Sequence, residues 1–364
     1  MTHRWSPQQD TALKAASRWI ANPERQVFRL FGYAGTGKTT LATHLAEGID
    51  GPVCFAAFTG KAALVMRARG CSEARTIHSL IYRPKDLDTE EPSFVLNGDS
   101  DAASASLIVI DECSMVDEAL GRDLLSFGKP VLVLGDPAQL PPVKGGGFFT
   151  ESEPDIMLTE IHRQASGDPI IRMSLDVREG RRLEPGIYGD SRIIGRSEID
   201  GASVTGADQV LVGMNRTRRN YNKRLREILG FHTVYPESGD KLVCLKNDPQ
   251  KGLLNGSLWR AKTGANLRRG RLRMTVVPEE EPSGRPRRVA IAPQFFDTEE
   301  EVPFSLRRNS DEFDYGYALT VHKAQGSQWD DVVLFDESFA FREHRNRWLY
   351  TGITRAARRL TLVV

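Results

Sequence analysis

A glycine-rich loop between an apolar segment and a helix-forming segment constrains the fold more than any other feature. Residues Gly32–Thr39 read Gly-Tyr-Ala-Gly-Thr-Gly-Lys-Thr and fit the phosphate-loop pattern G-x-x-x-x-G-K-[ST]. The loop follows the apolar run Val27–Phe31 and precedes the helical stretch Lys38–Ile49, which is the context that the pattern requires. The pattern therefore predicts a nucleoside triphosphate site in an α/β domain.

Each part of this loop has a predicted task. Its glycines let backbone N–H groups close around a phosphate, and the following helix adds its positive N-terminal end. We expect ATP and Mg²⁺ as cofactors, with the Lys38 ammonium on the β- and γ-phosphates and the Thr39 hydroxyl on Mg²⁺. The nucleotide-binding residues predicted in this segment are Gly32, Gly35, Thr36, Gly37, Lys38, Thr39 and Thr40.

Two acids follow another apolar run and supply the second half of a triphosphate site. The run Leu107–Ile110 leads directly into Asp111 and Glu112. Asp111 is placed to hold Mg²⁺, either directly or through water. Glu112 is the better candidate to orient and deprotonate the attacking water. The sequence therefore predicts hydrolysis as well as binding.

An amide follows a further apolar run, Val131–Leu134. Gln139 lies just beyond this run, and ligands of such sheets bind at the carboxyl ends of the strands. Gln139 is therefore a candidate sensor of the γ-phosphate. The alternative is an ordinary proline-rich turn, because Pro137, Pro141 and Pro142 flank it.

The length of the chain allows more than one hydrophobic core, but its net charge does not indicate a partner. The chain has 364 residues, of which 40% are hydrophobic and 27% are charged, and its formal net charge is +1. A nucleic-acid surface must therefore come from local Lys and Arg clusters. The N-terminal residues lack the apolar core of a signal peptide, no apolar run is long enough to cross a membrane, and the four cysteines form no CxxC pair. A cytoplasmic protein with reduced thiols is expected.

The order of segments predicts two α/β regions with two inserts. Buried parallel strands are expected at Val27–Phe31, Val53–Phe58, Leu107–Ile110 and Val131–Leu134, and later at Gln209–Val212, Val332–Phe335 and Leu360–Val363. Tyr82–Ser106 is either a small hairpin lobe or a flexible loop. Thr233–Ser310 holds short strand-like segments separated by turns, which predicts a small all-β module.

The order of the motifs resembles that of superfamily-1 DNA helicases of the RecD-like, Dda-like group, which move 5′ to 3′ on single strands. Beyond the phosphate loop and the two acids, the resemblance rests on six motifs, namely Ser6–Ala12, Ala57–Ala63, Thr76–Leu80, Leu158–Gln164, Tyr317–Ser327 and Tyr350–Ala356. The resemblance implies an α/β fold with two RecA-like motor domains, each with a parallel sheet. It also implies a pin-like insert and an SH3-like β insert.

The resemblance also implies domain boundaries. The first motor domain is expected at residues 1–81 and 107–150, and the pin-like insert at 82–106 with Phe94 as a weak candidate for the wedge. The second motor domain is expected at 151–232 and 311–364, interrupted by the SH3-like insert at 233–310.

The family motifs assign further roles by resemblance. Gln9 would read adenine, Arg163 would reach the γ-phosphate, and Arg355 would act as the arginine finger. Gly326 lies in the motif that couples DNA to nucleotide. Together with Lys38, Glu112 and Gln139, the two arginines form the expected catalytic set.

A DNA track needs hydroxyls, amides and cations for phosphates, and rings for bases. Phe58 or Trp259 is the expected stacking ring, and each polar candidate also has a purely structural alternative. The predicted DNA-binding residues are Phe58, Thr59, Lys61, Thr76, His78, Pro142, Asn255, Gly256, Thr320, His322 and Lys323. Clusters of Lys and Arg at Arg216–Arg226, Arg260–Arg273 and Arg342–Arg359 are either DNA-facing surfaces or solvated faces.

These observations favour an ATP-driven enzyme that translocates on single-stranded DNA and unwinds duplexes. Its expected partners are single strands, DNA forks and a single-strand-binding or replication protein, with the chain itself a monomer. An ATP-gated nucleic-acid clamp remains an alternative, because the pin-like insert is short. An RNA helicase of the same superfamily is a further alternative.

Overall fold

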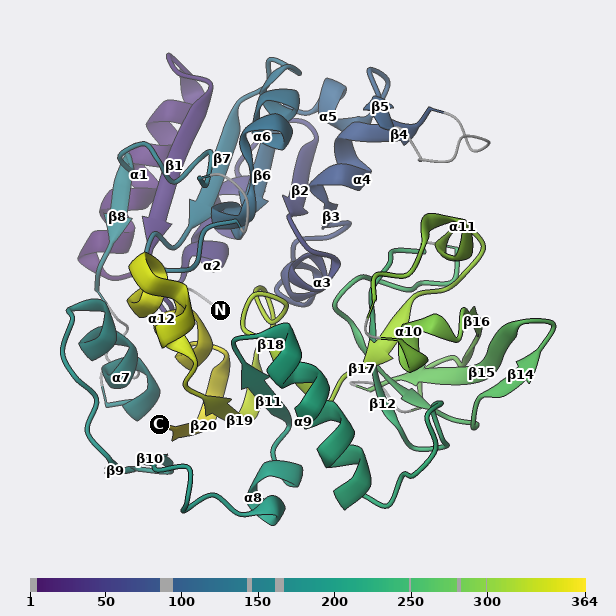
Figure 1. Ribbon diagram of the computed structural model, residues 1–364. Helices are drawn as coiled ribbons and strands as arrows, with labels where there is room; N and C mark the ends of the chain where they lie inside the picture. Colours follow the sequence, from purple (N-terminus) through teal and green to yellow (C-terminus); the bar gives the residue numbers. More distant parts are fainter. Residues whose placement is uncertain are drawn as a thin grey trace. The chain divides into compact units, whose positions relative to one another are not determined.

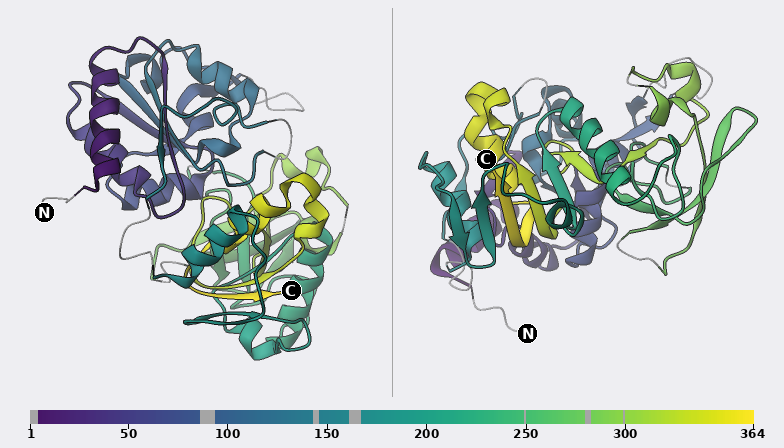
Figure 2. Two further views of the ribbon diagram at one scale, coloured as in Figure 1. Left: turned by 90° about the vertical axis from the view of Figure 1, so that its left-hand side faces the viewer. Right: turned by 60° about the horizontal axis from the view of Figure 1, so that its bottom comes forward.

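The computed structural model describes residues 5–85, 94–142, 146–160, 167–248, 250–279, 283–298 and 300–364. These residues form two compact units, which Figures 1 and 2 show as ribbons. Unit 1 holds the described residues up to Arg182 together with Asn346–Thr354. Unit 2 holds Leu183–Arg345 and Arg355–Val364. None of the described helices has both the length and the apolar composition that crossing a bilayer requires.

Unit 1 is built on a six-stranded parallel sheet with the order β3-β2-β6-β7-β1-β8. The strands are β1 (Val27–Gly32), β2 (Val53–Ala57), β3 (Arg75–Thr76), β6 (Leu107–Asp111), β7 (Val131–Gly135) and β8 (Ile156–Leu158). The helices are α1 (Pro7–Ala21), α2 (Lys38–Glu47), α3 (Gly60–Ala68), α4 (Ile77–Ile81), α5 (Asp101–Ser104), α6 (Glu118–Leu125) and α7 (Pro169–Arg178). The four strands predicted in this part of the chain are therefore confirmed.

Helices cover both faces of this sheet, which explains why its central strands are continuously apolar. Along β6, Leu107 and Val109 pack with residues of α1 and α2, whereas Ile108 and Ile110 pack with residues of α4 and α6. Successive side chains of a strand point to opposite faces, so a strand covered on both sides needs apolar residues throughout.

Unit 2 contains a second six-stranded sheet with the order β18-β11-β19-β20-β10-β9. Its strands are β9 (Gly186–Tyr188), β10 (Ser191–Ile194), β11 (Gln209–Val212), β18 (Ala318–Thr320), β19 (Trp329–Phe335) and β20 (Ala356–Val363). All pairs are parallel except β9 with β10. The helices α8 (Gly201–Thr205) and α9 (Asn215–Ile228) flank β11 in the chain. The predicted second α/β region is confirmed.

An antiparallel β module is inserted into unit 2, as predicted, but it is not all-β because it also contains two short helices. Its strands are β12 (Lys241–Cys244), β13 (Leu258–Ala261), β14 (Asn266–Arg268), β15 (Arg271–Pro278), β16 (Arg287–Ile291) and β17 (Phe313–Tyr315), with the short helices α10 (Gln294–Asp297) and α11 (Phe304–Arg307). The module does not end at residue 310 as predicted. It extends to Tyr315, because β17 pairs with β12.

A short antiparallel pair lies in the first insert. β4 (Tyr82–Pro84) pairs with β5 (Phe94–Leu96), and the segment that joins them lies outside the described residues. Of the two alternatives for this insert, paired strands are thus the one observed. Phe94 opposes Pro84 and its side chain is 59% exposed, so it is available for contact with a partner.

Two features of unit 1 were not predicted. The boundary at residue 150 is replaced by Arg182. β8 adds to the edge of the first sheet by pairing with β1, and Arg178 at the end of α7 stacks over Tyr33 of the phosphate loop. Residues Asn346–Thr354, which comprise most of helix α12 (Arg345–Ile353) and the residue after it, belong to unit 1, although the chain then leads into β20 of unit 2. Pairing and packing across long sequence separations decide both features.

A buried ion pair fastens α9 to the start of the β module. The guanidinium of Arg226 donates to both oxygens of Asp240 at 2.9 Å each, and both side chains are buried. Asp240 also accepts from the Tyr317 hydroxyl and the Glu237 backbone N–H. Removing one partner of such a pair leaves the other charge buried without compensation.

Asp240→Asn is therefore expected to lower the free energy of unfolding by about 3–5 kcal/mol. Urea unfolding monitored by circular dichroism measures this change. Asp330→Asn is the matched control, because Asp330 is an exposed acid paired with exposed Arg358 and surface changes stay within about 0.5 kcal/mol. Equal stability of the two variants would contradict the assignment.

Candidate nucleotide-binding site

The glycines of the phosphate loop occupy positions that other residues would not tolerate. Gly35 and Gly37 have φ of 78° and 83°, in the left-handed region that disfavours a Cβ. A Cβ on Gly32 would lie 2.7 Å from both the Cβ of Leu158 and the hydroxyl of Thr36. The loop therefore keeps the compact course that directs backbone N–H groups toward a phosphate, and α2 begins at Lys38 immediately after it.

The predicted metal ligands meet at the end of β6. The Thr39 hydroxyl donates to Asp111 across 2.7 Å, although 72 residues separate them in the chain. Lys38 lies in the same loop and donates to the carbonyls of Gly32 and Tyr33 at 2.7 and 3.0 Å. The Thr39 hydroxyl and the Asp111 carboxylate thus lie together, and hard oxygen ligands of this kind suit Mg²⁺.

Glu112 is held in an uncommon backbone conformation beside these groups. Its φ of 53° lies in the left-handed region, and its backbone N–H donates to Asp111 at 2.8 Å. Such a conformation in a residue other than glycine costs on the order of 1–3 kcal/mol and often occurs at functional sites. The backbone therefore turns sharply at the residue predicted to activate water.

Gln139 has an unsatisfied acceptor, which is informative because the side chain is buried. Within the described part of the chain, its amide oxygen has no hydrogen-bond partner. A buried polar atom of this kind costs about 1–3 kcal/mol unless a ligand or water pairs with it. The preceding Asp136 is also buried and accepts from the backbone of Ala138, which shapes the turn. These residues fit a bound water next to a triphosphate.

Gln9 anchors α1 to the phosphate loop. Its amide nitrogen donates to the Thr36 carbonyl at 3.1 Å, and its oxygen accepts from the Ser6 backbone at 3.0 Å. The neighbouring Gln8 contacts β8 and the residues after it. Its amide nitrogen donates to the Met157 carbonyl at 3.1 Å, and its oxygen accepts from the backbone of Thr159 and Glu160 at 2.8 Å each. Adenine reading by Gln9 stays a prediction. Thr40 lies exposed on α2.

α12 contributes two side chains that were not predicted as site residues. The hydroxyl of Tyr350 donates to Asp136 at 2.6 Å and accepts from the backbone N–H of Ala34 at 3.1 Å. Thr351 accepts from the backbone N–H of Leu140 at 3.0 Å. Burial raises the pKa of Tyr350 above its ordinary value, and nearby Asp136 raises it further, so the hydroxyl stays protonated and can donate.

These contacts join the phosphate loop and the Gln139 turn to one helix. The motif Tyr350–Ala356 was identified by its order, but sequence alone gave a role only to Arg355. A second unpredicted contact lies on the same loop, where the Arg178 guanidinium stacks over the Tyr33 ring at 3.5 Å. The only feature of the sequence that could have identified Tyr350 as a site residue is its position inside a motif. No feature of the sequence identified Arg178.

Arg355 and Gly326 come together in unit 2. The Arg355 guanidinium is buried and donates to the carbonyl of Ser327 at 3.1 Å, directly after Gly326, whose φ is 73°. The two motifs that these residues represent are thus joined by a hydrogen bond. Arg163 lies outside the described residues, so its predicted role is untested.

Several predicted DNA-binding residues of unit 1 lie where strands end and helices begin. Thr59 caps α3 by accepting from Ala62, and Thr76 caps α4 by accepting from Ser79. Phe58 is half-buried and meets the ring of exposed His78 edge-on at 6.1 Å. Lys61 is buried in the first turn of α3, and Pro142 is half-buried beyond β7. The two threonine side chains thus cap helices, and their predicted DNA contacts stay a prediction.

In unit 2, the residues Thr320, His322 and Lys323 lie at the end of β18. Thr320 accepts from the backbone of Lys323, and His322 contacts the ring of Phe341 at 5.3 Å. The Lys323 side chain is exposed, yet desolvation by its surroundings lowers its pKa, and Arg218 lowers it further. The three residues form one cluster.

Asn255 and Gly256 lie together in the turn before β13, where Gly256 has a φ of 85°. Trp259 was named as a possible base-stacking ring, and that prediction is wrong. Its side chain is 3% exposed and packs in the core of the β module, because β13 presents it inward.

Comparison with known protein families agrees with this geometry. Residues 5–195, more than half of the chain, match the family model described as AAA domain. The chain belongs to this family. Residues 315–363 also match the model described as UvrD-like helicase C-terminal domain. The resemblance to RecD-like and Dda-like proteins of superfamily 1 is thereby confirmed for this AAA-domain protein.

Two similar proteins carry helicase names. The "ATP-dependent RecD2 DNA helicase" of Deinococcus radiodurans is 31% identical over 360 residues, which covers 90% of this chain and 45% of that protein. The "ATP-dependent DNA helicase dda" of Enterobacteria phage T4 is 33% identical over 165 residues, covering 41% of this chain and 37% of that protein. The AAA-domain protein thus spans less than half the length of these relatives.

Solved structures show the same fold. A Pif1 helicase structure concerned with DNA unwinding at forked DNA has a TM-score of 0.60 at 19% identity and covers 99% of this chain and 92% of its own. The Bacteroides Pif1 helicase in complex with ADP-AlF3 and single-stranded DNA has a TM-score of 0.59 at 18% identity, with the same coverage. At this identity the likeness concerns the fold alone.

Tyr350→Phe removes the hydroxyl that joins α12 to the phosphate loop. The variant leaves one Asp136 oxygen and the Ala34 N–H without this partner, so the free energy of unfolding should fall by about 1–3 kcal/mol. Chemical denaturation measures the change. Tyr188→Phe is the control, because that hydroxyl donates to the exposed Glu184 carbonyl. Indistinguishable stabilities for wild type and Tyr350→Phe would contradict the role.

Proposed function

We propose that this chain is an ATP-dependent DNA translocase and helicase that moves 5′ to 3′ on single-stranded DNA and unwinds duplexes. The observation that carries the proposal is the hydrogen bond between Thr39 and Asp111, with Lys38 in the same loop and Glu112 next in the chain. This arrangement supports triphosphate hydrolysis. The family match, the UvrD-like segment and the names of the relatives support DNA as the track.

The proposed chemistry assigns one task to each residue. Lys38 binds the β- and γ-phosphates, while Thr39 and Asp111 hold Mg²⁺. Bound Mg²⁺ would neutralise charge that develops on the phosphates. Glu112 accepts a proton from the attacking water, and the unpaired oxygen of Gln139 orients that water by accepting its other hydrogen. Two acceptors on one water would fix the direction of attack.

Movement requires a second domain that responds to the γ-phosphate. We assign this response to Arg355, together with Arg163. The division between the compact units falls between Thr354 and Arg355, so the proposed sensor directly follows the helix that Tyr350 joins to the phosphate loop. A change at the loop would thus be carried along α12 to the start of unit 2.

The architecture proposed from the family resemblance has two RecA-like motor domains, one on each six-stranded sheet. The antiparallel module would serve as the SH3-like insert. The β4–β5 pair would serve as the base of a strand-separating pin, with exposed Phe94 as the wedge.

Glu112→Gln should permit ATP binding while reducing hydrolysis at least about 10²-fold, because the amide cannot accept the proton. Phosphate release and binding of a fluorescent ATP analogue separate the two steps. Glu118→Gln, an exposed acid on α6, is the control, and Lys38→Ala should abolish turnover. Near-normal hydrolysis by Glu112→Gln would rule out this base.

Arg355→Ala should reduce ATP hydrolysis by about 10³-fold or more, the contribution typical of an arginine that stabilises the transition state. Binding of ATP by the phosphate loop should remain. Single-turnover hydrolysis measures the effect, and Arg358→Ala is the control, because Arg358 is an exposed arginine on β20, three residues after Arg355. Equal rates for both variants would remove Arg355 from the catalytic set.

Polarity and strand separation are tested on duplexes with a 5′ or a 3′ single-stranded tail. We expect ATP hydrolysis that single-stranded DNA stimulates and unwinding of the 5′-tailed substrate alone. Stimulated hydrolysis without unwinding would favour the nucleic-acid clamp. Stimulation by RNA but not by DNA would favour the RNA helicase, and hydrolysis that no nucleic acid changes would overturn the motor altogether.

A further inference from the structure

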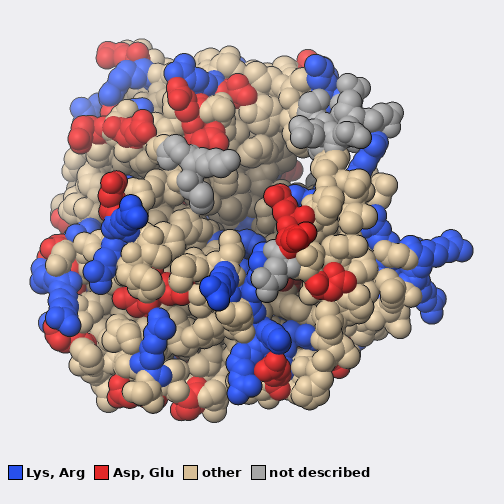
Figure 3. Space-filling model, in the orientation of Figure 1, with Lys and Arg blue, Asp and Glu red and all other residues tan. Residues whose placement is uncertain are grey.

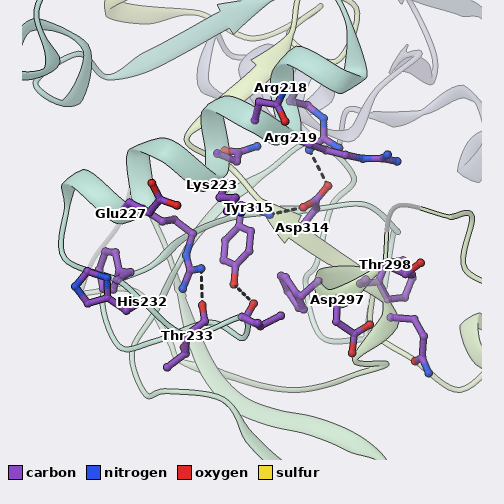
Figure 4. A pocket seen from close by; sticks show the side chains of 18 of the residues that line it. Arg218, Arg219, Lys223, Glu227, His232, Thr233, Asp297, Thr298, Asp314 and Tyr315 are labelled. Carbon is purple, nitrogen blue, oxygen red and sulfur yellow. Dashed lines mark hydrogen bonds and ion pairs between the residues drawn. The ribbon is translucent and has the colours of Figure 1, made fainter.

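The basic helix α9 forms one wall of a cavity of about 740 Å³ in unit 2 (Figure 4). Such a volume lies within the range of about 300–1,000 Å³ typical of small-ligand pockets. The opposite wall comes from α10, Thr298, Glu300 and Val302, and Tyr315 lies between the two walls. Neither the sequence motifs nor the proposed reaction assigns a role to this cavity.

The cationic side chains of α9 divide into two groups. Arg218 and Arg226 are buried in ion pairs with Asp314 and Asp240, so their charges are compensated. Arg219 and Lys223 also line the cavity but are exposed, and neither forms an ion pair or hydrogen bond with another described residue. Lys and Arg side chains gather over this helix in the space-filling view (Figure 3).

The remainder of the lining includes aromatic rings, acids on the opposite wall, and Glu227 of α9, which is paired with Arg224. Phe295 and Phe296 are half-buried on α10, and the Phe296 ring lies 5.1 Å from that of Tyr315. Asp297 and Glu300 are exposed on the far wall. The cavity therefore runs from free cations, past rings, to carboxylates.

This cavity adjoins the predicted DNA-binding cluster of the same unit. α9 contacts β18 through Asn222, whose side chain donates to the Ala318 carbonyl at 3.1 Å and accepts from its N–H at 2.8 Å. Lys323, just beyond β18, is close enough to Arg218 and Arg219 for their charges to lower its pKa. Single-stranded DNA bound at Lys323 thus lies next to residues that line the cavity.

The order of charges matches a nucleotide better than an acidic peptide. A nucleotide presents a phosphate at one end and a flat base with amino groups at the other. Arg219 and Lys223 suit the phosphates, the rings of α10 suit the base, and the carboxylates of Asp297 and Glu300 can accept from amino groups. An acidic peptide would meet repulsion from those same two carboxylates.

We propose that the cavity between α9 and α10 binds one nucleotide unit of the single strand, next to the cluster Thr320–Lys323. The proposal rests on the proposed function and extends its strand-binding surface into the β module. The cavity acts as an auxiliary grip that prolongs contact with the strand and takes no part in hydrolysis.

The test compares the affinity of the full chain for oligothymidylates of increasing length, by fluorescence anisotropy. The affinity of the wild type should rise about tenfold once the DNA strand is long enough to occupy the cavity. This rise corresponds to the stacking of one base. Arg219→Ala/Lys223→Ala should lose this gain and keep wild-type affinity for shorter strands. The slope of log affinity against log salt should fall by about 0.7 for each phosphate contact removed.

The matched control is Arg268→Ala/Arg273→Ala, which removes two exposed arginines of β14 and β15 that do not line the cavity. It should retain the gain. Photocrosslinking from a 5-iodouracil base placed along a long strand supplies a second readout. One position near an end of the bound strand should crosslink to the peptide containing Phe295 and Phe296, and the crosslink should weaken in the cavity variant.

The outcomes separate this inference from the function on which it rests. Wild type that binds no strand and shows no stimulated hydrolysis would overturn both. Wild type that binds strands, with the cavity variant matching it at every length and no crosslink at α10, would overturn the cavity alone. A cavity that binds free thymidine monophosphate while strand affinity is unchanged in the variant would also overturn it, since the site would then serve free nucleotides.

Discussion

The parallel pairing of β1, β7 and β6 is the constraint on which the rest of unit 1 depends. Because these strands run in one direction, their carboxyl ends lie at one edge of the sheet, and the phosphate loop, Asp111 and the Gln139 turn all follow those ends. Burial on both faces holds the strands in register. The hydrogen bond between Thr39 and Asp111 is a consequence of this register and sets the distance between the two predicted metal ligands.

Unit 2 also contains a largely parallel sheet, but here buried ion pairs hold a helix against the inserted β module. Its buried ion pairs, Arg226 with Asp240 and Arg218 with Asp314, fix α9 against the β module. With those charges compensated, the exposed cations of the helix are the ones left for a ligand. The same helix therefore both binds the β module and supplies the proposed contacts to single-stranded DNA.

Most of the fold followed from local patterns, and the errors came from contacts between distant segments. Apolar runs identified the central strands because these strands are covered on both faces. β8 was missed because three residues at a sheet edge carry little pattern, and this moved the boundary of unit 1 to Arg182. Trp259 was misread because a short strand can present an aromatic residue either to the core or to the solvent. The amino-acid sequence of the strand is the same in both cases.

By itself, the sequence determined the local chemistry: which loop closes around a phosphate, which acids follow which strand, and which motifs occur in which order. These properties depend on adjacent residues and on the backbone freedom of glycine. Only the tertiary structure decided that Tyr350 joins Asp136 and the phosphate loop, that the Gln139 oxygen finds no partner among the described residues, and that Arg219 and Lys223 face a cavity. Contact between residues that lie hundreds of positions apart depends on packing, which no local pattern encodes.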